Sequence, residues 1–158
     1  LCSRLRRGIL YNYAYEHNYT RIALGHHADD LNETLLMNLF FSGMTASMPP
    51  YLRSDDQRNT VIRPLCYVQE KQIQKITDQL AIPIIPCRLC GTQDGMQRAR
   101  VKGLINDLEQ DIPNVRASML AAIQNVRVSQ LADRKLSAFG QLVFEAPNND
   151  STPDHMAN

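Results

Sequence analysis

The stretch from Arg21 to Gly43, RIALGHHADDLNETLLMNLFFSG, constrains the fold more than any other part of the sequence. It opens with a short apolar run that ends in glycine, as expected for a buried strand. A polar turn with paired histidines and paired aspartates follows, and the next residues place an apolar stripe at helical spacing: Leu31, Leu35, Leu36, Leu39 and Phe40. The stretch therefore predicts a strand, a short turn and a helix that stops at Gly43, which is the start of a parallel α/β unit.

The rest of the sequence extends this pattern. Periodicity predicts helices over residues 4–17, 69–80, 97–111 and 114–136, and short apolar runs predict strands over 60–62 and 81–85. The polar segment 44–59 is rich in turn formers and is expected to be an exposed, hairpin-like connection. We therefore predict an α/β fold, a parallel sheet with flanking helices, in one domain over residues 1–136. Residues 137–158 are expected to form a polar, disordered tail.

Composition indicates a soluble protein. The apolar fraction is 44%, the charged fraction is 21%, and no apolar run approaches the length of about 18 residues that a membrane helix needs. The net charge is only +1, so no overall field points to a polyanionic partner. Basic residues do gather in two stretches, 1–21 and 88–102, each beside cysteine. Two interpretations stay open: a basic rim around a thiol-rich centre, or two solvated helix faces.

The acidic turn His26-His27-Ala28-Asp29-Asp30 admits a structural and a functional interpretation. Asp29 or Asp30 is well placed to cap the following helix, because an aspartate accepts hydrogen bonds from the free N–H groups there. The same position, at the carboxyl end of a parallel strand, is where open α/β sheets bind ligands, and a carboxylate there could hold Mg²⁺ or steer a nucleotide polyphosphate. A zinc site is disfavoured, because adjacent histidines point in different directions.

The cysteines suggest metal chemistry more than disulfides. Cys87 and Cys90, in PCRLCG, are separated by two residues, so that both sulfurs can reach one metal ion or cluster. Cys2 is the candidate for a third ligand. Cys66 lies between Leu65 and Tyr67, where a buried apolar role suits it better.

Several segments together resemble one family. GHHADDLNET, residues 25–34, resembles the GHHxDDxxET signature of the PP-loop ATP pyrophosphatase superfamily. Within it, five segments that occur in order resemble the tRNA 2-thiocytidine synthetase (TtcA) family: LCSRLRRGILY at 1–11, IALGHHADD at 22–30, MPPYLRSDD at 48–56, VIRPL at 61–65 and IIPCRLCGTQ at 84–93. The resemblance spans about residues 1–130, and the chain looks like the C-terminal part of these enzymes.

The resemblance implies a Rossmann-like fold of the adenine nucleotide alpha-hydrolase type, and a tRNA cytidine(32) 2-sulfurtransferase activity. Mg-ATP would adenylate C2 of a cytidine in the tRNA anticodon loop, and sulfur would then replace the oxygen with the help of a [4Fe-4S] cluster held by three cysteines. Soft thiolates suit iron, and the open iron corner would accept sulfur. The implied setting is the cytoplasm, with tRNA, a sulfur donor such as a cysteine desulfurase, and a homodimeric enzyme.

The resemblance also assigns residues. Cys2 matches the second cysteine of the family's CxxC, Cys90 matches the third cluster ligand, and Cys87 is a neighbour or a substitute ligand. Asp30 matches the acidic residue placed near the adenylated base. Arg6 stands where related thiolases carry a catalytic lysine, and since arginine holds its proton we expect it to stabilise charge or to bind RNA. Gly25, His26 and Asp29 are expected to line the pocket for ATP and magnesium.

Two departures limit what this sequence is expected to do. The phosphate-binding SGGKDS loop of the family occurs nowhere in it, and the first cysteine of the CxxC would stand two positions before Leu1. Without that loop the ATP phosphates lose their main cradle, so we expect the chain alone to be inactive. Three alternatives stay open: a metal- and tRNA-binding module without turnover, a uridine thiolase of the same superfamily, and a degenerate fragment with buried cysteines.

Overall fold

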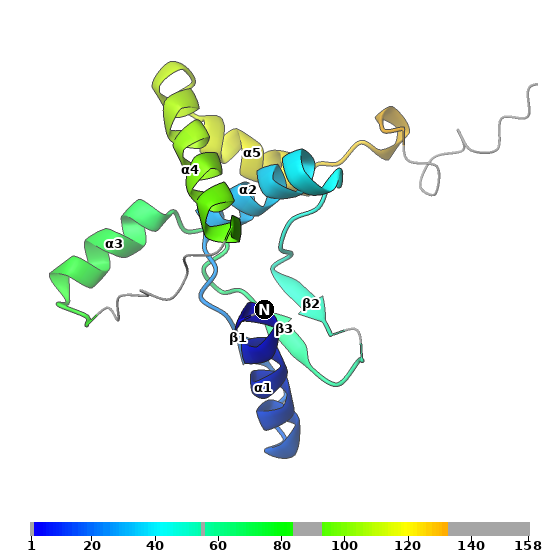
Figure 1. Cartoon of the computed structure of the whole chain (residues 1–158). Helices are drawn as coiled ribbons and strands as arrows, with labels where there is room; N and C mark the ends of the chain where they lie inside the picture. Colours follow the sequence, from blue (N-terminus) through cyan, green and yellow to red (C-terminus); the bar gives the residue numbers. More distant parts are fainter. Residues whose placement is uncertain (1, 55, 84–92, 133–158) are drawn as a thin grey trace, which may run out of the picture. The chain divides into compact units, whose positions relative to one another are not determined.

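The computed structural model describes residues 2–54, 56–83 and 93–132, with no account of the side chains of residues 2–4, 93 and 94. Contacts divide the chain into two units, residues 1–124 and residues 125–158. Figure 1 shows the elements of the first unit in chain order, from α1 to α5. No helix in the described part of the chain has the length and apolar character required to cross a membrane.

A small mixed sheet joins the first half of the chain. Its strand order is β1-β3-β2, with β1 at Ile22–Ala23, β2 at Tyr51–Arg53 and β3 at Thr60–Ile62. Strands β1 and β3 are parallel, with Ile22 opposite Val61, whereas β2 and β3 form an antiparallel hairpin. The expected α/β fold is confirmed, with a parallel strand pair and a hairpin. The hairpin makes the sheet mixed rather than parallel throughout, because a short turn can only return the chain antiparallel.

Helix α1 (Cys2–Glu16) precedes β1, and α2 (Ala28–Met37) follows it. Asn18, with φ of 57°, stops α1 in the left-handed conformation that asparagine tolerates. Helix α2 passes into one π-helical turn, Asn38–Ser42, which ends at Gly43 with φ of 62°. The predicted helix stop is confirmed, although the last turn is wider than an α-helix.

The described residues of the first unit contain three further α-helices. They are α3 (Glu70–Gln79), α4 (Gln93–Asp111) and α5 (Val115–Gln124). The predicted helix over 114–136 is wrong beyond Gln124, where only a 3₁₀ turn at Val128–Gln130 follows in the described residues. The predicted strand over 81–85 is also wrong at residues 81–83, because Ala81 takes φ of 48° in a turn; residues 84 and 85 lie outside the described ones.

The core lies where α2 packs against α4 and α5, and at β3, the central strand of the sheet. Leu31 of α2, Val61 of β3 and Ile105 of α4 are at most 2% exposed. The N–H of Ala28, the first residue of α2, donates to the carbonyl of Val68 just before α3, at 2.9 Å. The start of α2 is thereby fixed between β1, the entry to α3, and α4, which is the part of the fold that positions the acidic turn.

Candidate functional site

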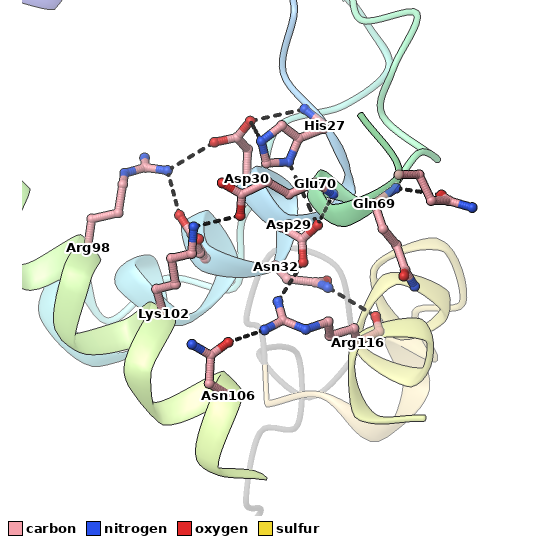
Figure 2. Close-up of polar contacts among 12 residues, drawn as sticks. His27, Asp29, Asp30, Asn32, Gln69, Glu70, Arg98, Lys102, Asn106 and Arg116 are labelled. Carbon is pink, nitrogen blue, oxygen red and sulfur yellow. Dashed lines mark hydrogen bonds and ion pairs between the residues drawn. The ribbon is translucent and has the colours of Figure 1, made fainter. Parts of the chain in front are cut away.

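The acidic turn lies between the end of β1 and the first turn of α2, as the sequence predicts. Figure 2 shows His27, Asp29 and Asp30 of this turn with their polar contacts. The carboxylate of Asp30 accepts a hydrogen bond from the backbone N–H of His27, the N-cap residue, at 3.0 Å. This contact caps α2 and turns the Asp30 side chain back toward the loop. The capping interpretation is therefore confirmed for Asp30, whose side chain still keeps 23% of its surface exposed.

Asp29 has different partners. Its side chain is only 5% exposed, and one carboxylate oxygen accepts a hydrogen bond from the guanidinium of Arg116. The other oxygen accepts the backbone N–H of Glu70 at 2.6 Å, so Asp29 caps α3 rather than its own helix. Both oxygens are thus engaged within the chain, and Asp29 links α2 to α3 and α5.

Arg98 of α4 reaches the exposed side of the same turn. One guanidinium nitrogen, Nη1, lies 3.0 Å from a carboxylate oxygen of Glu33 and 3.4 Å from one of Asp30. One turn further along α4, Lys102 pairs with Glu70 at 2.6 Å. Two cations of the basic stretch 88–102 are therefore paired with acids of α2 and α3.

His26 and Arg63 form a second polar contact beside the turn. Arg63, which is 8% exposed, donates Nε–H to Nδ1 of His26 at 3.3 Å and a second N–H to the carbonyl of Pro49. Burial lowers the pKa of His26, and the Arg63 charge lowers it further against the opposing effect of Asp30. His26 is therefore a neutral imidazole at physiological pH, with Nδ1 as the acceptor.

The carboxyl group of Glu33 gives a pH-dependent prediction. Burial raises the pKa of Glu33 above its ordinary value, even though the Arg98 charge lowers it. A carboxyl group whose pKa is higher in the folded than in the unfolded chain favours folding while it is protonated, at pH below its ordinary pKa. This stabilisation is lost as the pH rises through the pKa of the folded state. We therefore expect Glu33→Gln to raise the melting temperature at pH 7 relative to the parent chain, and this gain to vanish near pH 4. Thermal denaturation at both pH values checks this; a variant less stable than the parent at pH 7 would mean that the Arg98 pair outweighs burial.

A cavity of about 370 Å³ opens beside Asp29, between α3 and α4. Its charged lining side chains are mostly paired with one another: Asp29 and Glu109 with Arg116, and Glu70 with Lys102. In the described ranges, no three side chains of histidine, cysteine, aspartate or glutamate come together as a metal site. The cavity therefore has the character of an ion-paired helix junction.

The remaining predicted residues fall in different places. Gly25 is exposed at the end of β1, with open space where a side chain would stand, and Arg6 is exposed on α1. Cys2 is the first residue of α1, but its side chain, like Cys87 and Cys90 altogether, lies outside the described residues. Cys66 is 2% exposed, which confirms its predicted buried role. The structure thus brings Gly25, His26, Asp29 and Asp30 together between the end of β1 and the first turn of α2.

Sequence reasoning missed the three arginines that organise this turn, namely Arg63, Arg98 and Arg116. In the sequence, Arg98 is one of several cations in the basic stretch 88–102, and Arg63 is one residue of the VIRPL segment. For Arg116 the sequence holds no signal, since its partner Asp29 lies 87 positions away.

A model of the PP-loop domain matches residues 2–85. Curated relatives are named tRNA-cytidine(32) 2-sulfurtransferase. The Bdellovibrio bacteriovorus protein is 52% identical over 142 residues, which cover 90% of this chain and 55% of that protein. The Pseudomonas syringae pv. tomato protein is 54% identical, with 90% and 52% covered. The Methylococcus capsulatus protein is 48% identical over 157 residues, with 99% and 54% covered. The chain thus spans about half the length of the curated relatives it matches.

Among solved structures, the chain is similar to the U34-tRNA thiolase NcsA from Methanococcus maripaludis, whose structure includes its [4Fe-4S] cluster. The TM-score is 0.60 at 22% identity, and the match covers 78% of this chain and 41% of that one. At this identity the likeness speaks for the fold, and it agrees with the α/β architecture described above.

Proposed function

Because this chain belongs to the PP-loop domain family, we propose that it acts in the ATP-dependent 2-thiolation of a cytidine in tRNA. The observation that carries the proposal is the 48% identity to a tRNA-cytidine(32) 2-sulfurtransferase over 157 residues, a length that includes both the acidic turn and PCRLCG. The resemblance of the five ordered segments to the tRNA 2-thiocytidine synthetase family points the same way. The whole activity is proposed for a protein that also contains a phosphate-binding loop.

We propose that Asp30 is the residue of the acidic turn that faces ATP, magnesium and the target base. It is the more exposed of the two aspartates, and its carboxylate retains lone pairs beyond those that accept from His27 and Arg98. Asp29 would shape the pocket indirectly, because a magnesium ion could reach its oxygens only by displacing Arg116 or the N–H of Glu70. Gly25 and the neutral His26 would line the nucleotide pocket at the end of β1.

The cysteines other than the buried Cys66 have the ligand chemistry that an iron–sulfur cluster needs. Cys2, Cys87 and Cys90 supply soft thiolates, and Cys90 stands three positions before α4, the helix that packs on α2. When bound, ATP would supply the adenylyl group that activates the base, and the cluster would carry the incoming sulfur. Arg6, on the helix that begins at Cys2, would stabilise negative charge or bind RNA phosphate.

The further partners and the location are proposals as well. We propose tRNA as the substrate, a cysteine desulfurase as the source of sulfur, a homodimer as the working form, and the cytoplasm as the location. The tRNA surface would draw more on α1 than on Arg98 and Lys102, since these two cations are engaged with carboxylates whereas Arg7 is exposed.

The test compares Asp30→Asn with the parent, each joined to an upstream segment that carries the SGGKDS loop and the missing cysteine. Asparagine keeps an oxygen that can accept the His27 N–H, so the helix cap survives while the charge is lost. We expect tRNA-dependent release of AMP to fall by about 10²–10⁴-fold, the usual range for a positioned acid–base group. Asp107→Asn, an exposed change on α4, is the matched control and should leave the rate unchanged.

The products decide among the alternatives. 2-Thiocytidine detected by mass spectrometry of digested tRNA supports the proposal, and thiouridine would assign the chain to the uridine thiolases instead. Salt-sensitive tRNA binding without AMP release from the joined protein would indicate a binding module. Full activity of Asp30→Asn would reduce that carboxylate to a helix cap.

A further inference from the structure

Arg98 occupies a place that the proposed reaction does not yet explain. It projects from α4 onto the first turns of α2, where the same nitrogen, Nη1, contacts Glu33 at 3.0 Å and Asp30 at 3.4 Å (Figure 2). Asp30 and Glu33 are three positions apart on α2 and therefore share one helix face. Their exposure differs, since the Glu33 side chain is 5% exposed and that of Asp30 is 23% exposed.

Glu33, the buried carboxylate of the two, anchors Arg98. A charge-assisted hydrogen bond to a carboxylate that is screened from water is stronger than one at the surface. The Glu33 contact is also the shorter of the two. Glu33 therefore fixes Arg98, and Arg98 in turn reaches outward to Asp30.

Asp30, the more exposed of the two carboxylates that contact Arg98, is consequently held at both oxygens. One oxygen of Asp30 accepts the backbone N–H of His27 at 3.0 Å, and the other faces Arg98. A short side chain restrained from two sides has one orientation, which is the condition for a catalytic carboxylate to meet its substrate without reorganising. Removing Arg98 releases one of these restraints and leaves the cap in place.

A phosphate-binding role for Arg98 is disfavoured by the charge balance. With both carboxylates ionised, the cluster of Asp30, Glu33 and Arg98 has a net charge of −1, and such a cluster repels an RNA phosphate. Its contacts are also directed at α2, across 68 and 65 positions of sequence. This arrangement suits a residue that acts through Asp30.

We propose that Arg98 is a positioning residue for the thiolation reaction: held by the buried carboxylate of Glu33, it orients Asp30 toward the substrate. This inference rests on the proposed function, because it assigns Asp30 a substrate to face. It adds that α4, the helix directly after PCRLCG, sets the orientation of the acidic turn.

The kinetic test uses Arg98→Gln in the chain joined to the upstream segment described above. We expect kcat for 2-thiocytidine formation to fall by about 10–100-fold, the range expected for misplacing one group, with KM for tRNA within about two-fold of the parent. Arg98→Lys, which keeps the charge near both carboxylates, should recover a large part of kcat. Arg100→Gln, an exposed change two positions along α4, should change neither parameter. A rise in KM that is relieved at low salt, with kcat unchanged, would overturn the inference in favour of phosphate binding.

A pH profile gives a readout that a purely structural role would not move. The charged groups that face Glu33 are Asp30 on its own helix and Arg98 and Lys102 on α4. As Glu33 takes up a proton, it loses the charge that holds Arg98, so kcat of the parent should fall on the acid side. In Glu33→Gln, the fall in kcat that comes from protonation of Glu33 should disappear. At neutral pH, kcat of this variant should equal the lower kcat that the parent has once Glu33 is protonated. An unchanged acid limb and an unchanged neutral rate would contradict the role of Glu33.

The two proposals fail in distinguishable ways. If the joined parent protein forms no thiolated base, the proposed function fails. The contact between Glu33 and Arg98 can still be measured by carboxyl carbon NMR of the 158-residue chain. There we expect the pKa of Glu33 to be above its ordinary value, and to rise further in Arg98→Gln because the compensating charge is gone. If Glu33 titrates identically in the two chains, the Arg98 contact does not exist in solution and the inference falls alone.

Discussion

Replacing Arg116 with methionine is expected to lower the free energy of unfolding by about 3–5 kcal/mol, the usual effect of removing one partner of a buried ion pair. The Arg116 side chain is 11% exposed and joins three elements. Its guanidinium donates to Asp29 of α2, and to Glu109 and Asn106 of α4. Its backbone carbonyl accepts the side-chain amide of Asn32 at 3.0 Å. A single domain has only about 5–15 kcal/mol of net stability, so the loss would leave a large unfolded fraction on mild heating.

The reason for so large an effect is the charge left behind. Without Arg116, the carboxylate of Asp29 stays buried beside the N–H of Glu70 and the ring of His27, whose Nδ1 lies 3.8 Å away, and it has no guanidinium to balance its charge. Methionine fills a similar volume, so loss of packing contributes little and the unpaired charge dominates. Urea titration of the parent and the variant measures the difference directly.

A double-mutant cycle separates the pair from the general effect of the substitution. Asp29→Asn removes the charge and keeps an oxygen for the Glu70 N–H, so adding it to Arg116→Met should return a substantial part of the lost stability. Arg100→Met, at an exposed position on α4, is the matched control and should change stability by less than about 0.5 kcal/mol. Strictly additive effects of the two changes would show that the ion pair contributes nothing.

Local signals were sufficient for much of the fold. The helix predicted over 69–80 is α3 at Glu70–Gln79, and the strand predicted over 60–62 is β3. The helix is predicted by periodicity and the strand by a short apolar run, both of which depend on neighbouring residues. The stop at Gly43 is also local, because a left-handed residue is required there. The end of α5 at Gln124 was missed because apolar residues continue beyond it, at Val126 and Val128, without a proline or glycine to mark the boundary.

In the candidate site, too, features that depend on neighbouring residues could be predicted, and contacts between residues far apart in the sequence could not. That the acidic turn follows a strand and that Asp30 caps α2 could be predicted, because both depend on residues close in sequence. Which cation meets which carboxylate could not, since Arg98 and Glu33 are 65 positions apart and many pairings satisfy the same composition. Asp29 and Asp30 look equivalent in the sequence, yet the three-dimensional contacts bury one and leave the other partly exposed. The division of roles between them is therefore a tertiary property.

Changing Cys90 to serine is expected to abolish assembly of an iron–sulfur cluster when the chain is reconstituted anaerobically with iron and sulfide. Serine is a hard oxygen ligand with a far higher pKa than a thiol, so it replaces a thiolate on iron poorly. The parent should become brown and retain iron after gel filtration, and Cys90→Ser should remain colourless. Iron and sulfide content, together with the visible absorption spectrum, measure the difference.

Cys66→Ala provides the internal control. Cys66 is 2% exposed and packs in the turn after β3, so its loss should lower stability slightly and leave the colour unchanged. Loss of colour in Cys66→Ala with the fold retained would place a ligand where the structure has a buried thiol. Colourless protein in every case, the parent included, would favour a fragment without a cluster.

Substitution of Cys87 distinguishes two possible sets of three cluster ligands: Cys2, Cys87 and Cys90, or the upstream cysteine with Cys2 and Cys90. In the chain alone, Cys2, Cys87 and Cys90 are the three cysteines outside the buried one, so Cys87→Ser should lower iron content almost as far as Cys90→Ser. Once the upstream cysteine of the CxxC pair is supplied, it competes with Cys87 for the same iron, and Cys87→Ser should then be tolerated while Cys90→Ser is not. The reverse result, tolerance of Cys90→Ser only, would make Cys87 the third ligand. Because each cysteine is compared in the chain alone and in the joined protein, the outcome assigns the ligands independently of any measured thiolation.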